Sequence, residues 1–392
     1  MKILFLCGAD HKYGTLKMAI NIIEFMNKYN KFEFIVLTQK QGEINQFCNE
    51  KGVENYVVPY RYCVYAPHTK KLLNLLKKYL KVCIVSFYNK RALGKLKKLV
   101  NLDTVNIIHT NINRDLFGMM VSKKYKIPNI THLREYSKDH FQLEFLYPNQ
   151  INFMNTYSEK FIAISKAVEK DWIQRGLDRK KIEMIYDGVD EQGITFQEKS
   201  LCDKVKIVMC GGIYEGKGQL QLVKALKLLK DRRILNIDVD IYGDNEGKVN
   251  YRAVVEEYIH DNNLHEIAHL RGYKADVSKI LYQYDIGVVC SKSEGFGLVT
   301  VEYMLAGLCP VVSNTGANKE LVINNHTGVL YKYGDIDSLA DALENVIINK
   351  SFREECGKSA LNRAGKEFTM ARCAQEISNI YMEIAGEKND CV

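Results

Sequence analysis

Short apolar runs alternate with amphipathic stretches from one end of the chain to the other. The runs have the length of buried strands and are rich in Val and Ile, whereas the stretches between them place apolar residues at helical spacing. Strands are predicted in the first half at residues 3–6, 34–38, 56–58, 84–87, 105–109, 130–133, 161–164 and 182–186, and in the second half at residues 205–210, 237–242, 268–271, 286–290, 310–313 and 328–331. This alternation predicts parallel sheets with helices on both faces.

One polar stretch divides the pattern into two similar halves. Residues 187–203 are poor in apolar side chains, and a new first strand follows them that runs into glycines, as the first strand of the chain does. We therefore expect a linker at 191–203 between two doubly wound α/β domains, residues 1–190 and 204–370. The last helix-like segment, at about 371–392, has no strand after it and is expected to cross back to the first domain. Ligands of such sheets bind at the carboxyl ends of the strands, which predicts a deep cleft between the domains.

Composition excludes several classes of protein. The chain has 392 residues, of which 46% are hydrophobic and 26% are charged, so disorder along most of its length is excluded. The apolar run at residues 1–7 is too short for a secretory signal or a membrane span. None of the 11 cysteines forms a CxxC pair, which argues against a zinc ribbon or a disulfide framework and favours reduced thiols in the cytoplasm.

A metal site is also not expected. His265 and His269 are four residues apart but precede or begin a predicted strand, where a buried turn is the simpler interpretation. Asp238 and Asp240 form a DxD sequence, yet they lie inside a predicted strand, whereas a metal site normally needs a strand end or a loop. We therefore expect no metal and no other cofactor.

The net charge of +8 is unevenly distributed. Between Asn55 and Leu102 there is no acidic residue, and leucines interleave there with lysines at roughly helical spacing. The basic residues of this window are Arg61, Lys70, Lys71, Lys77, Lys78, Lys81, Lys90, Arg91, Lys95, Lys97 and Lys98. Three interpretations remain open: a solvated helix face, a helix attracted to anionic lipid headgroups, and a nucleic-acid surface. No RNA-binding aromatic signature accompanies the lysines, so we expect no nucleic-acid partner.

Two glycine-rich loops follow predicted strands of the second half. The first holds Gly211 and Gly212 and continues to Lys217 before a helix begins. It matches neither the Walker loop nor GxGxxG, so by itself it is weak evidence for phosphate binding. The second runs from Glu294 through two glycines into a helix that carries Glu302. The amides at this helix start are suited to an anion such as a diphosphate. The alternative is an ordinary helix start with acidic residues near its positive end.

The second loop resembles a known signature. Glu294 and Glu302 stand within EGFGLVTVEYMLAGLCPVVSNTGANKELV, which looks like the E-x7-E motif of the family-four (group 1) retaining glycosyltransferases of GT-B fold. The preceding RGYKADVSKILYQYDIGVVCSKSEGFG is similar to the base-binding turn, helix and strand of that family. FIAISKAVEKDWIQRG with KIEMIYDGVD, and VNIIHTN with KIPNITHLREY, resemble its first domain. The resemblance spans roughly residues 1–370 and implies two Rossmann-like domains, the first for the acceptor and the second for a nucleotide sugar.

The resemblance also implies roles for individual residues. Lys217 would neutralise the donor diphosphate, Glu294 would contact the donor sugar near the reacting carbon, and His132 would contact the same sugar; these are the expected catalytic residues. Other expected donor-binding positions are Gly211, Gly212, Tyr273, Lys274, Gly295, Phe296, Gly297, Leu298 and Glu302. Of these, Glu302 would hold the ribose, and the backbone around Tyr273 and Lys274 would take the base.

The chain departs from the family pattern in two places. Gly212 stands where the family usually has an Arg paired with the Lys of the phosphate loop. The N-terminal glycine loop is altered too, and Tyr13 and Gly14 are taken as its counterpart and as acceptor-binding residues. Arg134 is a further candidate, either for the acceptor or as support for its own loop.

These observations lead to one expected reaction. A sugar would pass from a nucleotide sugar, with UDP the commonest base in the family, to a glycan acceptor with retention at the anomeric carbon. The basic window suggests a lipid-linked acceptor of capsule, exopolysaccharide or lipopolysaccharide synthesis, and a peripheral place on the inner face of the plasma membrane. The alternatives are a GT-B-like nucleotide-sugar epimerase and a non-enzymatic protein that binds anionic lipid.

Overall fold

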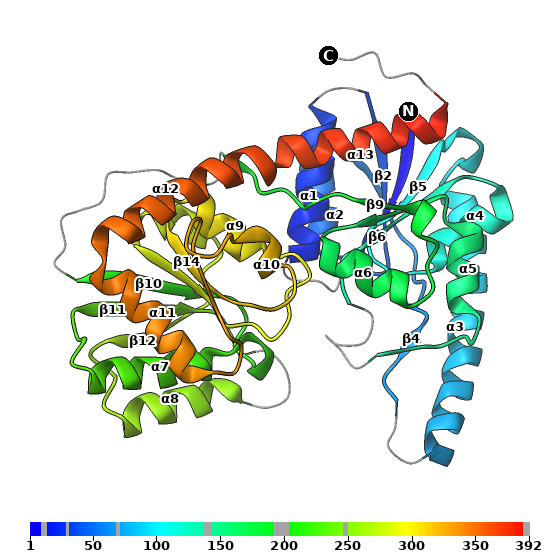
Figure 1. Ribbon diagram of the computed structural model, residues 1–392. Coiled ribbons are helices and arrows are strands. Elements are labelled where there is room, and N and C mark those ends of the chain that lie inside the picture. The colour runs from blue at the N-terminus through cyan, green and yellow to red at the C-terminus, as the bar shows by residue number, and fades with distance from the viewer. Residues whose placement is uncertain are drawn as a thin grey trace. The chain divides into compact units, whose positions relative to one another are not determined.

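The structure is a computed structural model that describes residues 1–8, 14–28, 31–67, 71–136, 143–191, 194, 204–245 and 250–386. The chain forms two compact units (Figure 1). The first comprises Met1–Gly188 together with Met370–Val392, and the second comprises Val189–Thr369.

The first unit is built on a seven-stranded sheet in which every strand pair is parallel. Its order is β3-β2-β1-β5-β6-β8-β9. The strands are β1 (Lys2–Leu6), β2 (Glu33–Thr38), β3 (Glu54–Val57), β5 (Ile107–Thr110), β6 (Asn129–Leu133), β8 (Lys160–Ala163) and β9 (Ile182–Met184). An additional antiparallel pair, β4 (Val64–Tyr65) and β7 (Glu144–Phe145), is not foreseen by the sequence pattern because each strand has only two residues.

Helices from both ends of the chain complete this unit. They are α1 (Gly14–Asn27), α2 (Glu43–Lys51), α3 (Lys71–Leu99), α4 (Phe117–Tyr125), α5 (Gln150–Tyr157), α6 (Lys166–Gln174) and α13 (Met370–Ala385). Helix α13, red in Figure 1, packs on α1 and on β5. Its buried residues recur every three or four positions and include Ile377 and Tyr381, so one apolar face attaches the end of the chain to the first sheet.

The second unit holds a six-stranded parallel sheet of order β12-β11-β10-β13-β14-β15. Its strands are β10 (Val205–Cys210), β11 (Ile237–Tyr242), β12 (Ala268–Gly272), β13 (Ile286–Val289), β14 (Cys309–Ser313) and β15 (Val329–Tyr331). Its helices are α7 (Gln219–Asp231), α8 (Tyr251–Asp261), α9 (Leu298–Leu305), α10 (Asn318–Leu321), α11 (Ile336–Ile348) and α12 (Lys350–Glu367). In both sheets the first two crossovers move to one side of the starting strand and the next crossover moves to the other.

One predicted strand is wrong. Residues 84–87 lie inside α3, where Ile84 and Phe87 are half-exposed instead of buried. The run of β-branched residues favours a strand locally, but it is flanked on both sides by leucines and lysines without proline, and helix formation propagates through it. Only the second half of α3 packs on the core, through Val85, Asn89 and Ala92.

Across the described residues, no helix combines the length and the apolar composition that a membrane span requires. The first half of α3 exposes several apolar side chains, and lysines lie between them in the sequence.

Candidate functional site

The point where the strand order reverses in the second unit lies between β10 and β13. These strands are neighbours, and the chain leaves them toward opposite edges of the sheet. In open parallel sheets such a switch point leaves a crevice at the carboxyl ends of the strands. The loops that begin there are 211–218 and 290–297, which are the two glycine-rich loops found in the sequence.

The loop after β10 is held by main-chain contacts. Gly211 has a φ of 144° and donates its N–H to the carbonyl of Tyr242 at 3.0 Å. A Cβ on Gly243 would lie 1.9 Å from the carbonyl oxygen of Gly211, so glycine is needed at that position for the two loops to touch. The carbonyl of Gly212 accepts a hydrogen bond from the buried side chain of Gln219. Main-chain contacts and the side chain of Gln219 therefore hold the start of this loop in place.

Lys217 and Glu294 meet in an ion pair. Lys217 ends a short 3-10 turn (Glu215–Lys217), and its Nζ lies 2.6 Å from Oε1 of Glu294. Their side chains are 26% and 13% exposed, so the pair is only partly shielded from water. The main chain holds the two loops together as well, because Lys292 donates its N–H to the carbonyl of Gly216. The structure therefore brings together the two residues expected to serve the diphosphate and the sugar.

Glu294 is fixed by the loop that follows β14. Its carbonyl accepts the N–H of Ala317 at 3.0 Å. Gly316 has a φ of 51°, and a Cβ there would lie 2.4 Å from the carbonyl oxygen of Glu294. The main chain of Glu294 is thus held in place, while its side chain stays 13% exposed.

Helix α9 begins directly after this loop. Its N-cap residue Gly297 has a φ of 100°, and no side chain caps it. Tyr303 anchors the helix, because its hydroxyl accepts the N–H of Cys210 at 2.7 Å and its ring leaves no room for a Cβ on Gly287. The amides of residues 296–298 and the carboxylate of Glu302 are thereby carried at the end of the strands where Lys217 lies. An uncapped helix start carries partial positive charge, which suits an anion.

The remaining expected donor residues are brought to the same end of the sheet. Tyr273 and Lys274 follow β12 directly, and both are exposed. Gly243, after β11, donates its N–H to the carbonyl of Gly272. The ends of β11 and β12 are therefore tied together beside the loop after β10.

The carboxyl end of the first sheet is built from buried side chains. His132 lies near the end of β6 and is fully buried, and its Nδ1 lies 2.8 Å from Nε2 of His109 on β5. His109 in turn bonds Tyr381 of α13 through its Nδ1. Burial and the charge of Arg134 hold the pKa of His132 well below its usual range, and the same causes lower the pKa of His109 to about 3.

Arg134 is engaged by the protein itself. It donates two hydrogen bonds of 2.7 Å from Nη1 to Asp187, and its Nε donates to Asn111. Its Nη2 lies 3.4 Å from Nδ1 of His132. The guanidinium is buried, and of the two roles open in the sequence this geometry favours support of the site over contact with an acceptor. Of the other two acceptor candidates, Gly14 is the first residue of α1 and Tyr13 lies outside the described residues.

Sequence reasoning missed His109, Asp187 and Tyr381. Tyr381 lies 272 residues from its partner His109, so no local motif could join them. The available signals were the polar residues His109 and Thr110 directly after an apolar run, and Tyr381 on the apolar face of the last helix.

Comparison with known proteins now gives these arrangements a context. A family model described as "Glycosyl transferases group 1" matches residues 191–363. An uncharacterized glycosyltransferase of Methanocaldococcus jannaschii is 24% identical over 94% of this chain and 95% of its own length. The UDP-Gal:alpha-D-GlcNAc-diphosphoundecaprenol alpha-1,3-galactosyltransferase of Escherichia coli is 25% identical over 91% of this chain and 93% of its own length. Residues 191–363 therefore match the group 1 glycosyltransferases, and the similarity to curated glycosyltransferases extends over most of the chain.

Solved structures show which fold the two units form. The Anabaena protein HepE, in complex with UDP, superposes with a TM-score of 0.79 at 19% identity and covers 98% of this chain and 100% of its own. TarM of Staphylococcus aureus superposes with a TM-score of 0.74 at 13% identity over 97% of this chain and 99% of its own. The two units are therefore the two Rossmann-like domains of the GT-B fold.

The DxD sequence lies within β11, and its carboxylates have protein partners. Asp240 accepts hydrogen bonds from Arg271 at 2.6 Å and from Tyr284 at 2.7 Å, and Asp238 lies 3.1 Å from His269. Among the described residues, no cluster of three or more His, Cys, Asp or Glu has the arrangement of a metal site.

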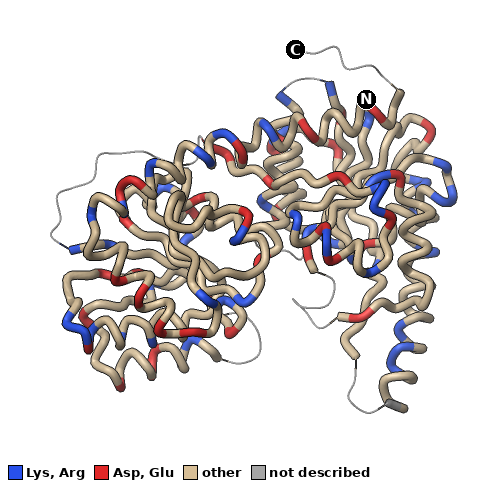
Figure 2. Tube along the Cα trace, viewed as in Figure 1, with Lys and Arg blue, Asp and Glu red and all other residues tan. Residues whose placement is uncertain are grey.

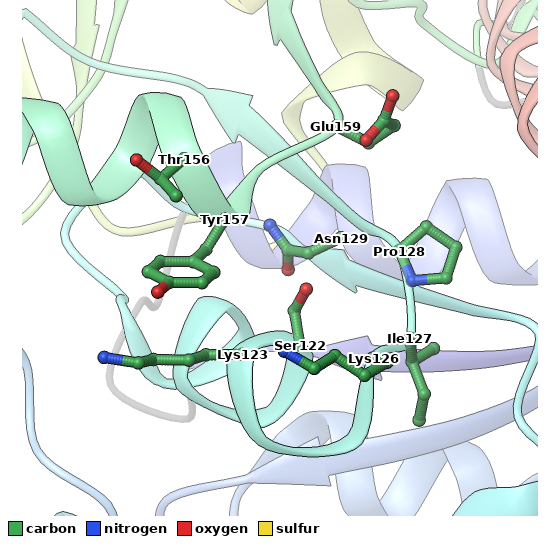
Figure 3. Close-up of a pocket in the computed structure, with 9 residues that line it drawn as sticks. All are labelled: Ser122, Lys123, Lys126, Ile127, Pro128, Asn129, Thr156, Tyr157 and Glu159. Carbon is green, nitrogen blue, oxygen red and sulfur yellow. The ribbon is translucent and has the colours of Figure 1, made fainter.

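A hollow of about 250 Å³ lies at the other end of the first sheet. It is lined by the end of α4, the start of β6 and the end of α5, including Lys123, Asn129 and Tyr157 (Figure 3). Asn129 begins β6, whereas His132 lies near its carboxyl end. This hollow is therefore separate from the residues that the glycosyltransferase motifs single out.

Proposed function

We propose that this chain transfers a sugar from a nucleotide sugar, with UDP as the nucleotide, to a lipid-linked glycan acceptor with retention of anomeric configuration. The observation that carries the proposal is the Lys217–Glu294 pair beside the start of α9, where the N-cap residue Gly297 makes no side-chain hydrogen bond. A cation and main-chain amides at one point suit a diphosphate, and a carboxylate beside them suits the hydroxyls of the attached sugar. UDP-bound HepE and the diphosphoundecaprenol-linked substrate of the Escherichia coli relative support the choice of donor and acceptor.

In the proposed reaction the bond between the anomeric carbon and the diphosphate oxygen breaks. Lys217 and the amides of residues 296–298 stabilise the negative charge that develops on the departing diphosphate, which is electrostatic catalysis. The acceptor oxygen attacks from the same face, and its proton passes to the departing phosphate oxygen. No carboxylate has to form a covalent intermediate, and the roles of Glu294 and Glu302 are to hold the sugar and the ribose.

Gly212, in place of the family's usual arginine, leaves Lys217 as the expected cation of its loop. In the ligand-free state Glu294 neutralises this lysine. Donor binding therefore exchanges a carboxylate for a diphosphate at Nζ and leaves Glu294 available to the sugar. We expect Glu294→Gln to affect sugar selection more than affinity for the free nucleoside diphosphate.

The test is a panel of nucleotide sugars incubated with and without GlcNAc-diphosphoundecaprenol. We expect nucleoside diphosphate release that depends on the acceptor, and a product whose anomeric configuration, read by NMR, matches the donor. Inversion would contradict the mechanism. A donor isomer formed without acceptor would favour an epimerase, and the absence of both turnover and donor-dependent thermal stabilisation would favour a non-enzymatic protein.

We also propose that the first half of α3 binds an anionic membrane surface. Its residues from Leu72 to Ile84 include no buried side chain, and Leu72 is 79% and Tyr79 67% exposed. Lysines follow the same stretch, and Figure 2 shows them along the projecting part of the helix. Each lysine near an anionic surface contributes about 1 kcal/mol, and the leucines add burial in the headgroup region. A lipid-linked acceptor would then be met at the surface where it resides.

Vesicle flotation tests this part separately from catalysis. The wild-type chain should float with vesicles of phosphatidylcholine and phosphatidylglycerol at low salt but not with phosphatidylcholine alone. The triple variant K77Q/K78Q/K81Q should lose most of this binding. K350Q/K358Q/K366Q removes the same charge from exposed positions of α12 and should float like the wild type. Equal binding by both variants would contradict the assignment to α3.

A further inference from the structure

A chain of hydrogen bonds crosses the carboxyl end of the first sheet. It runs from the hydroxyl of Tyr381 to Nδ1 of His109, from Nε2 of His109 to Nδ1 of His132 at 2.8 Å, and meets Nη2 of Arg134 at 3.4 Å. All four side chains are buried, three of them completely. The members come from α13, β5 and β6 and the residues just after β6.

Arg134 determines which atom is the donor in each hydrogen bond of this series. A guanidinium can only donate, so Nδ1 of His132 presents a lone pair to Arg134. The bond from His109 to the same atom then requires the proton to sit on Nε2 of His109. Nδ1 of His109 is left with a lone pair, and Tyr381 donates its hydroxyl proton to it.

This direction places the one ring proton of neutral His132 on Nε2. Within the part of the chain that the structure describes, Nε2 of His132 is buried and has no hydrogen-bond partner. A buried donor without an acceptor is unfavourable, so an oxygen from a ligand would be bound favourably there. Burial and the charge of Arg134 keep the ring neutral.

We propose that Arg134, His109 and Tyr381 are positioning residues that hold His132 in its Nε2–H tautomer, so that it donates a hydrogen bond to an oxygen of the bound sugar and moves no proton. The proposal rests on the transferase function above and specifies how one of its residues acts. Asp187 belongs to the same device, because its two hydrogen bonds hold Arg134 in place.

The charged and titratable groups around the ring support a fixed tautomer. His109 on β5 and Arg134 after β6 act on the ring itself, and the groups that interact with Arg134 are Asp187 after β9, Cys7 after β1, and Cys373 and Tyr381 on α13. Burial raises the pKa of Cys7 to about 12 and raises that of Cys373 and of Tyr381, so these groups stay neutral. Arg134 is then the cation nearest the ring, and it repels a proton on Nδ1.

The direct test is NMR of the full chain with ring-labelled histidine. The signals of His132 and His109 are assigned by their loss in H132Q and H109Q. We expect both rings to be neutral with the proton on Nε2 from about pH 5 to pH 8. A proton on Nδ1 of His132, or a titration of its ring in this range, would overturn the proposal, and neither outcome depends on finding the substrate.

Two pairs of variants test the consequence for transfer. A glutamine amide can reach the place of Nε2 and an asparagine amide only that of Nδ1, so H132Q should keep turnover within about tenfold of the wild type and H132N should not.

Y381F removes the donor to His109 and should lower turnover about fivefold to tenfold with a second His109 tautomer in the spectrum. Y125F, which removes a hydroxyl near the end of α4, is the matched control and should change neither.

Failure of this inference and failure of the proposed function give different results. If the wild type transfers no sugar from any donor but His132 is the Nε2–H tautomer, the transferase proposal fails and the positioning device stands. If transfer occurs and H132Q is as inactive as H132N, with an inflection in the wild-type rate near the ordinary histidine pKa, His132 moves a proton and the inference is wrong.

Discussion

The carboxyl ends of the two sheets are held together by different kinds of contact. In the first unit the functional end consists of buried side chains that bond one another, such as His132, Arg134 and Asp187. In the second unit it consists of glycines, main-chain hydrogen bonds and a helix start, with one partly exposed ion pair. We therefore expect a single substitution to lower stability and activity together in the first unit, but to lower activity far more than stability in the second.

The largest expected effect is on stability and comes from Arg134→Met. It leaves the carboxylate of Asp187 buried without its partner, which should lower the free energy of unfolding by about 3–5 kcal/mol. Urea unfolding measures it. R232M breaks two ion pairs on the surface of the second unit, with Asp341 and Glu344, and should cost less than about 1 kcal/mol. Equal losses in the two variants would remove the contrast between the ends of the sheets.

The next largest effect is on turnover and comes from Lys217→Ala. Removing a group that stabilises the leaving diphosphate should lower turnover about 100-fold or more, with little change in the melting temperature. The assay is nucleoside diphosphate release at saturating donor. K227A removes a lysine from an exposed pair on α7 and serves as control. A K217A variant with near-normal turnover would show that the switch point of the second unit does not bind the diphosphate.

A smaller effect concerns pH and the first unit. Burial raises the pKa of Asp115, just before α4, from 3.8 to about 7. Between these values the native carboxyl keeps a proton that the unfolded chain has released, so its contribution to stability falls as pH rises, by about 1.4 kcal/mol per pH unit. The amide that D115N introduces does not titrate in this range. The free energy of unfolding of D115N relative to the wild type should therefore rise by about 2 kcal/mol between about pH 5 and pH 7. A constant difference would contradict the burial of a protonated carboxyl.

The smallest expected effect is that of Tyr303→Phe in the second unit. It removes the acceptor of the Cys210 N–H and should cost about 1 kcal/mol in the free energy of unfolding. Because this bond positions α9 against β10, donor affinity measured by titration should weaken by a few fold. Y282F removes a tyrosine hydroxyl that accepts an exposed hydrogen bond from Gln283 and should alter neither. A stability loss as large as that of R134M would show that side chains, too, hold the second unit's end together.

The sequence was sufficient to predict those parts of the candidate site that are formed by contiguous residues. The loops around Lys217 and Glu294 follow directly from strands whose apolar pattern is clear, so their meeting could be predicted from the rule for parallel sheets. Prediction failed at 84–87 because Ile84, Val85 and Phe87, although of high strand propensity, carry too little information to overcome the helix around them. It also missed His109, Asp187 and Tyr381, because their role exists only once strands and a distant helix have packed.

Helix α13 has a consequence for the order in which the molecule is made. Residues 1–188 leave the ribosome while α13 is still to be translated, and the second unit is synthesised in between. Until α13 arrives, α1 lacks its apolar cover and His109 lacks the hydroxyl of Tyr381. The first unit, most of which is translated first, therefore completes its folding last.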